Sequence, residues 1–176
     1  MYQSVRELVD QVAVHITSCP TPMIENAVLA AARDFCIMTR CHQVKGSVTA
    51  QPGKLAYEFI ANEPYTKVVD VINPSHAGFV SVDTLTLDAA ATGSITADLV
   101  LVPSHRAKKV WAPLTMQYAD GIVSGALSRL YRQPAAAHFN PELARQEQTR
   151  YADEMHNARM AIKPPSKVKQ RGHQWL

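Results

Sequence analysis

The chain has 176 residues, of which 47% are hydrophobic and 19% are charged, and its formal net charge is +3. A chain of this length forms one domain, or one domain with an inserted subdomain. No apolar run approaches the roughly 18–20 residues that cross a bilayer, and the amphipathic N-terminus with its acidic residues is unlike a signal peptide, so we expect no membrane segment.

The first forty residues have the spacing of two amphipathic helices. Apolar side chains recur every three or four positions, which predicts a first helix over residues 2–17. The segment 19–22 contains two prolines and ends this helix. Thr21 and Pro22 are suited to the start of a helix, so a second helix is expected over residues 22–40.

The period changes near residue 44, where the sequence becomes rich in Val, Thr, Gly, Pro and Asn. Short alternating runs separated by Gly, Pro and Asn turns are typical of β-strands. The pattern predicts an antiparallel β-module of four to six strands, with the clearest runs at residues 46–50, 55–60, 67–72, 84–87 and 95–101.

Helical spacing returns after Pro113 and predicts helices over residues 114–131 and 141–162. Gly121 and Gly125 lie one turn apart in the third helix, where glycine lowers helix stability. We interpret them, together with Ala30 and Ala31 of the second helix, as faces of close helix contact. The contact is either between subunits or within one chain, and the sequence leaves both alternatives open.

The fold class predicted from these elements is α+β. We expect a four-helix, adaptor-like bundle with an inserted small antiparallel β-module and an extended C-terminal arm. The expected domains are a bundle of residues 1–42 and 110–163, a β-module of residues 43–109, and an arm of residues 164–176. The expected bundle core contains Phe35, Trp111, Tyr118, Leu127 and Tyr151.

The residues that usually carry catalysis or bind metals are scattered. No two of the seven histidines are spaced as metal ligands on a helix. Cys41 and His42 are adjacent, but they have no further ligands at a usual zinc spacing, and Cys36 is expected to be a buried thiol. Three cysteines cannot all pair within the chain, which favours a reduced compartment. No nucleotide-binding or hydrolase motif is present. We therefore expect no enzyme, no cofactor and no metal site.

The C-terminal arm is basic and ends in two large apolar residues. Lys163, Lys167, Lys169 and Arg171 carry four positive charges without an acidic residue among them, so the rest of the chain has a net charge of −1. Pro164 and Pro165 favour an extended exit from the last helix. Because the arm ends in Trp175 and Leu176, we expect it to dock onto another molecule.

Three segments resemble the head-to-tail adaptor (connector) proteins of tailed bacteriophages. The first, residues 19–40, ends in the run Phe35-Cys36-x-x-Thr39-Arg40. The second, residues 111–131, includes Tyr118-Ala119-Asp120-Gly121, and the third begins Asn140-Pro141-Glu142-Leu143-Ala144. The β-module matches that family only in kind, and the last four residues match no motif of it.

The resemblance implies a virion protein in the neck between capsid and tail, assembled in the cytoplasm of the host bacterium. It implies a twelvefold ring that binds the portal protein, extends the DNA channel and holds the tail or the next neck component. The arm residues Lys163, Lys167, Lys169, Arg171, Trp175 and Leu176 would dock to the portal, and some of these cations could contact DNA in the channel. The alternative is a nucleic-acid-binding protein that uses the same basic arm.

Overall fold

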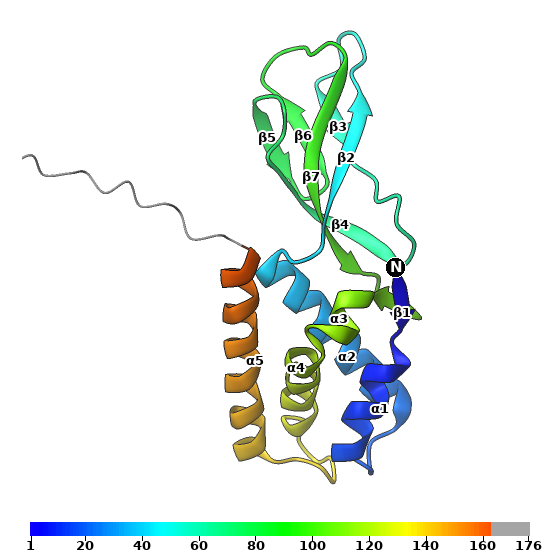
Figure 1. Ribbon diagram of the computed structural model, residues 1–176, viewed down its shortest axis with the longest axis vertical. Helices are drawn as coiled ribbons and strands as arrows, with labels where there is room; N and C mark the ends of the chain where they lie inside the picture. The colour runs from blue at the N-terminus through cyan, green and yellow to red at the C-terminus, as the bar shows by residue number, and fades with distance from the viewer. Residues whose placement is uncertain (163–176) are drawn as a thin grey trace, which may run out of the picture.

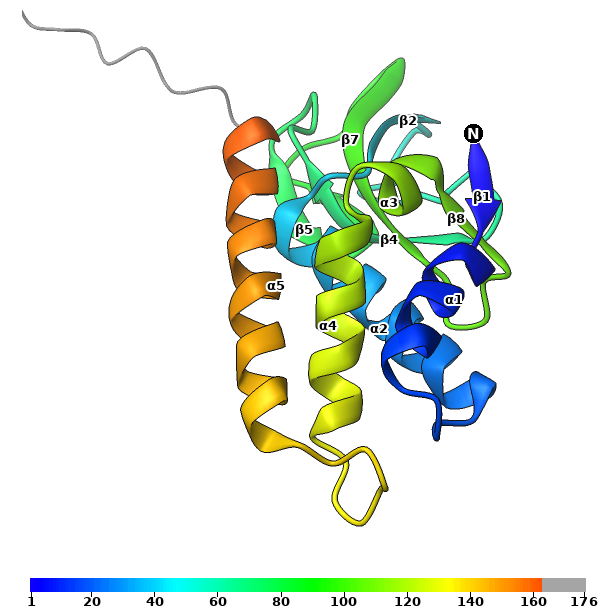
Figure 2. The same cartoon turned by 60° about the horizontal axis from the view of Figure 1, so that its bottom comes forward.

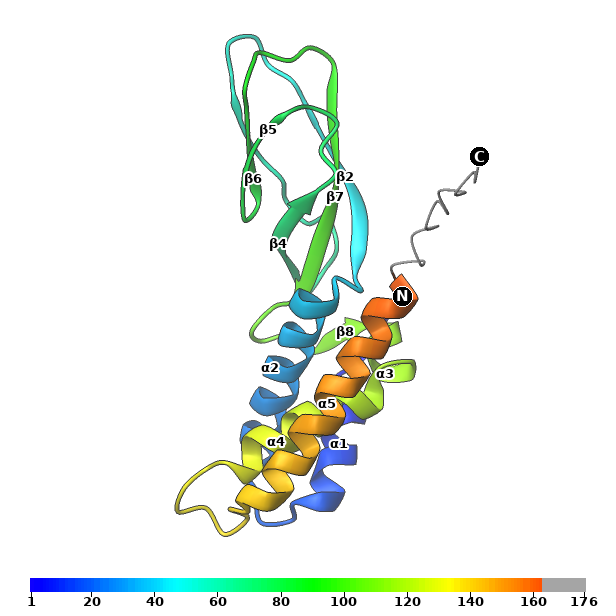
Figure 3. The same ribbon diagram turned by 90° about the vertical axis from the view of Figure 1, so that its left-hand side faces the viewer.

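The computed structural model describes residues 1–162, and these form two parts that stand end to end (Figure 1). The first is a helical body, made of residues 1–42 and 110–162. The second is the β-module of residues 43–109, which projects from one end of the body in both side views (Figures 1 and 3). The chain enters and leaves the module at the end that faces the body.

The protein is α+β, but the expected four-helix bundle is wrong. The described residues form five helices and three small antiparallel sheets. The helices are α1 (Arg6–His15), α2 (Thr21–Thr39), α3 (Ala112–Met116), α4 (Ala119–Tyr131) and α5 (Pro141–Ile162). None of these helices is both long and apolar enough to cross a bilayer.

The first difference from the expected bundle lies at the N-terminus. Residues Tyr2–Ser4 form strand β1 and pair antiparallel with β8 (Lys109–Trp111), so α1 begins only at Arg6. The N–H of Val5 donates to the carbonyl of Lys108, which extends this contact to the start of the helix. The apolar period of the sequence continues into these residues, but pairing with a strand a hundred residues away determines their conformation.

The second difference is a break in the expected helix over residues 114–131. The N–H groups of Gln117 and Tyr118 both donate to the carbonyl of Pro113, which ends α3 before α4 begins. The ring of Tyr118 lies 5.1 Å from that of Phe35, centroid to centroid. The chain therefore turns at residues 117–118, and this turn places an aromatic side chain against the body core.

Six strands of the β-module form two three-stranded sheets. One sheet has the order β2 (Gln43–Thr49), β7 (Ser94–Pro103), β4 (Thr66–Ile72), and the other has the order β3 (Ala56–Glu58), β6 (Thr84–Leu87), β5 (Gly78–Ser81). The number of strands agrees with the expected four to six, although β5 was not among the predicted runs. Where β2 crosses β7, Gly46 lies against the side chain of Leu99, in the space that a Cβ would need.

The buried apolar residues form two clusters. The body core joins α1, α2, α4 and α5 around the fully buried Phe35 and includes Val102 at the end of β7, and the module core joins both sheets around Leu85 and Ile95. The expected core residues Leu127 and Tyr151 are buried in the body, and Tyr118 is half-buried beside Phe35. Trp111 is also half-buried, but it lies at the joint between body and module instead of inside the bundle.

Candidate functional site

Helices α2, α4 and α5 approach one another closely at two glycines of α4 (Figure 2). A Cβ on Gly125 would stand 2.8 Å from the ring of Tyr151 and 3.1 Å from the Cβ of Ala31. A Cβ on Gly121 would stand 2.9 Å from the Cβ of Glu154. Contacts within one chain therefore account for both glycines.

Polar contacts fix the same three helices. Arg129 of α4 forms an ion pair with Asp34 of α2, and its Nη1 donates to the carbonyl of Gly125 over 2.7 Å. The hydroxyl of Tyr151 donates to the carbonyl of Ala31 over 2.8 Å, and burial raises the pKa of this tyrosine. Ala31 is completely buried, whereas Ala30 is half-buried. A role of these small residues in subunit contacts stays a prediction.

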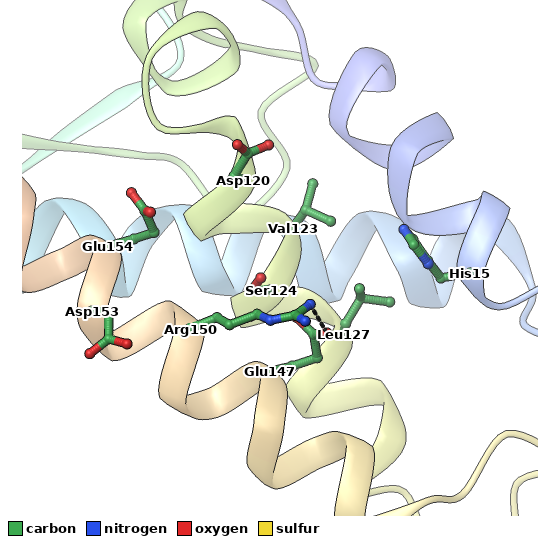
Figure 4. A pocket seen from close by; sticks show the side chains of 9 residues that line it. All are labelled: His15, Asp120, Val123, Ser124, Leu127, Glu147, Arg150, Asp153 and Glu154. Carbon is green, nitrogen blue, oxygen red and sulfur yellow. Dashed lines mark hydrogen bonds and ion pairs between the residues drawn. The ribbon is translucent and has the colours of Figure 1, made fainter.

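A groove of about 350 Å³ follows the pair of helices α4 and α5 (Figure 4). Its floor is made by α4, through Val123, Ser124 and Leu127, and Asp120 lies at one end. His15, the last residue of α1, lines the groove from the side of α4 that faces away from α5 (Figure 4). In Figure 4 the hydroxyl of Ser124 faces the side chains of α5 across this groove.

The α5 side of the groove carries most of its charge. Glu147, Arg150, Asp153 and Glu154 line it over two helical turns. Glu147 accepts a hydrogen bond of 2.9 Å from Arg150, and the side chain of Glu147 is 11% exposed while that of Arg150 is 69% exposed. This contact leaves a nearly buried carboxylate whose guanidinium partner stands in solvent.

The sequence alone did not indicate this groove. Its α5 residues are charged, which is typical of a solvent-exposed helix face, yet Glu147 is buried. The available signal was the helical spacing of residues 147, 150 and 154, which places them on one stripe of the helix. Recognising a groove also required knowing that this stripe faces Ser124 of α4.

A second cluster lies at the joint between body and module. His42, at the end of α2, is 1% exposed, and its ring stacks on Trp111 with centroids 4.4 Å apart and planes at 1°. Its Nε2 lies 3.1 Å from a carboxylate oxygen of Glu63, which also accepts a hydrogen bond from the hydroxyl of Tyr2. The cluster connects α2, β1 and β8 with the linker before β4.

Burial determines the protonation state of His42. It lowers the pKa of the imidazole, and the attraction of Glu63 opposes this shift only in part. The ring is therefore neutral near pH 7, and its Nε2–H donates to Glu63. Burial and Glu63 together raise the pKa of Tyr2. Two residues 21 positions apart in the chain thus form a pair that no sequence spacing indicated.

The cysteines that attracted attention in the sequence lie in the body. Cys36 is completely buried, as expected, and its Sγ is 3.9 Å from that of Cys41. Contact with Cys41 and burial raise the pKa of Cys36. Within residues 1–162, no three His, Cys, Asp or Glu side chains are grouped so that they could hold a metal ion.

The predicted docking residues of the arm, Lys163, Lys167, Lys169, Arg171, Trp175 and Leu176, lie outside the described residues. Comparison with known proteins adds no family: no protein-family model matches the chain, and no curated protein matches it. Function is therefore argued from the contacts above and from the resemblance of three segments.

Proposed function

We propose that this protein is a structural head-to-tail adaptor of a tailed bacteriophage. Twelve copies form a ring that binds the portal protein, extends the DNA channel and offers an attachment surface to the tail or to the next neck component. The protein acts by binding and performs no turnover. It lies in the neck of the virion after assembly in the bacterial cytoplasm, and its contacts with channel DNA are with phosphates and independent of base sequence.

The observation that carries this proposal is the packing of the three segments that resemble adaptor proteins. Asp34 of the first segment pairs with Arg129 of the second. Ala31 of the first segment accepts a hydrogen bond from Tyr151, which lies on the helix that the third segment begins. The helices that carry or follow the three resembling segments are thus in direct contact, which supports a shared structural unit rather than three chance likenesses.

The β-module supports the proposal with a surface suited to a protein partner. Ile60 is 71% exposed and Phe79 is 70% exposed, and Val82 in the β5–β6 turn is also exposed. The N–H of Phe59 donates to the carbonyl of Asp83, which holds Ile60 near this turn. Large apolar side chains exposed on a projecting module are available to a protein partner.

In this proposal the arm reaches the portal. Trp175 and Leu176 fill an apolar site there, with Trp175 as the main anchor, because large aromatic side chains dominate interface energetics. The cations before them increase the rate of encounter with acidic groups more than they increase the final affinity.

Co-expression with the portal protein encoded in the same genome tests the proposal. We expect negative-stain images of purified portal rings to show an added ring of twelvefold symmetry, and we expect Trp175→Ala to reduce its occupancy. Substitution of the exposed Met160 by Ala is the matched control, and it should leave occupancy unchanged. Undecorated portal rings, together with binding to bare DNA that falls steeply with salt, would overturn the adaptor function.

A further inference from the structure

We propose that the groove between α4 and α5 binds the basic C-terminal segment, residues 163–176, of a second copy of this chain. The inference rests on the proposed function for the ring in which two copies meet, but it does not require the portal. It assigns the basic stretch to the neighbouring subunit in place of the acidic groups of the portal, and it leaves the apolar tip for the portal.

The groove has the charge that such a segment needs. Four carboxylates and one guanidinium line it, which gives a formal net charge of −3 with His15 neutral. Glu147 is paired with Arg150, but Asp120, Asp153 and Glu154 form no ion pair with any residue from 1 to 162. Like charges along one groove repel each other, and a bound cation relieves this repulsion.

Two buried polar groups in the groove indicate a site that is built for a ligand. Ser124 is 9% exposed, lines the groove and makes no side-chain hydrogen bond within the described part of the chain. The carboxylate of Glu147 is nearly buried beside it on the facing helix. A lysine ammonium donates three hydrogen bonds, which the hydroxyl oxygen of Ser124 and the carboxylate of Glu147 can accept.

The C-terminal segment has the complementary pattern. Lys167, Lys169 and Arg171 alternate with uncharged residues, so an extended chain presents all three on one side at intervals of about 6.6 Å. They would cover about 13 Å, and the stretch of α5 from Glu147 to Glu154 is about 10.5 Å long. The segment thus brings three cations to a groove in which three carboxylates form no ion pair within residues 1–162.

The connection to α5 favours the groove of a second copy. Helix α5 continues for eight residues beyond Glu154, which is about 12 Å of helix. The basic segment therefore begins about 12 Å beyond its own groove, at the end of a helix whose axis leads away from that groove. A second copy next to this end of α5 offers the same groove without a return along the helix. Such a head-to-tail contact repeats around a ring.

Zero-length carbodiimide cross-linking of the full chain tests this inference, because it joins a lysine to a carboxylate only where the two are in contact. A mixture of ¹⁴N- and ¹⁵N-labelled protein at low salt distinguishes links between copies from links within one copy. We expect mixed-isotope links from Lys167 and Lys169 to Asp120, Asp153 or Glu154. Glu58 and Asp88 of the β-module are exposed carboxylates that serve as internal controls.

Paired substitutions sharpen the test. Asp153→Asn with Glu154→Gln should reduce the remaining links to Asp120 about tenfold, which corresponds to ~1.4 kcal/mol of binding. The control variant Glu58→Gln with Asp88→Asn removes the same charge from the β-module and should leave the number of links to Asp120 unchanged. A charge-reversed variant should restore the links between copies. It combines Asp153→Lys and Glu154→Lys with Lys167→Glu and Lys169→Glu, so the links would join positions 153 and 154 of one copy to positions 167 and 169 of another.

Three results would overturn the inference: links only within one copy, links to Glu58 and Asp88 as frequent as links to the groove, or no links from the segment at all. None of them depends on the portal. If the links appear as expected but the protein does not decorate portal rings, the adaptor function fails while the groove retains its assigned partner.

Discussion

The helical body and the β-module are held together by different kinds of contact. In the body, helices separated by more than a hundred residues interlock through the buried ring of Phe35 and the close approach at Gly125. In the module, ladder hydrogen bonds align short strands, and its largest apolar side chains include several that point into solvent. The comparison shows a body held by packing between helices that are far apart in the chain and a module held by pairing between short strands.

Removing an aromatic ring from each part should give the largest difference between the two parts in the free energy of unfolding. Phe35→Ala should lower the free energy of unfolding by about 3–5 kcal/mol, because the ring is fully buried and its loss leaves a cavity. Phe79→Ala in the module should change it by less than about 0.5 kcal/mol. Chemical denaturation followed by circular dichroism measures both. Equal losses at the two positions would contradict the division between core and contact surface.

Adding a methyl group at a closely packed glycine of each part should give the next largest difference in stability. Gly125→Ala should cost about 1–3 kcal/mol, because the Tyr151 ring that it meets is fixed by its hydrogen bond to Ala31. Gly46→Ala meets the side chain of Leu99, which can change rotamer, so its cost should be smaller. Thermal denaturation of the two variants provides the comparison, and a larger loss for Gly46→Ala would show that the module is the more rigid part.

Removing one tyrosine hydroxyl from each part should lower the free energy of unfolding by a smaller amount. Tyr151→Phe should cost about 0.5–1.5 kcal/mol, since it removes one hydrogen bond and leaves the carbonyl of Ala31 unpaired. The hydroxyl of Tyr57 in the module contacts backbone groups of Gln51 and Lys54 over 2.9–3.2 Å. Tyr57→Phe should therefore cost at least as much as Tyr151→Phe in urea titrations. A neutral Tyr57→Phe would mean that this loop contributes nothing to the module.

Acidification should weaken the joint between the two parts through His42. Burial holds its folded pKa below the unfolded value of about 6.5. Above that value both states are neutral and the contribution of His42 to stability is complete. As pH falls below it, the unfolded chain binds the proton first, so stability is lost until the folded pKa is reached. One pKa unit of difference corresponds to about 1.4 kcal/mol.

The variant His42→Phe keeps a ring on Trp111 but cannot titrate, so its stability should change less than that of the wild type between about pH 7 and about pH 5. His15→Gln, at an exposed histidine, is the control and should keep the wild-type dependence. Unfolding curves at the two pH values measure the difference. Identical pH dependence in wild type and His42→Phe would exclude His42 as the titrating group.

The sequence predicted those helix ends that are set by contacts between residues a few positions apart. The expected start of the last helix at Pro141 is confirmed, because the side chain of Asn140 caps the N–H groups of Glu142 and Leu143. The end of α2 was also predicted closely, and Arg40 there adopts a left-handed conformation with φ of 55°. Capping residues of this kind act within a few positions, so a sequence displays them directly.

Contacts between distant residues account for the errors. Strand β1 forms by pairing with β8, which a local sequence pattern does not indicate. The α3–α4 turn depends on the position of Phe35 relative to Tyr118. The α4–α5 groove and the pair of His42 and Glu63 likewise combine residues that no periodicity connects. Pattern reasoning therefore gave the α+β class and most elements, but not how the body is assembled or where its charged groove lies.

The two ends of the β-module meet where they leave the body. The N–H of Leu101, on the strand that returns to the body, donates to the carbonyl of His42, the last residue before the module, over 2.9 Å. An insertion whose ends are hydrogen-bonded neighbours can be shortened, extended or exchanged with little strain on the rest of the chain. Mutation and recombination can thus vary the module while the helices keep their arrangement, and a lineage can acquire a new partner without rebuilding its scaffold.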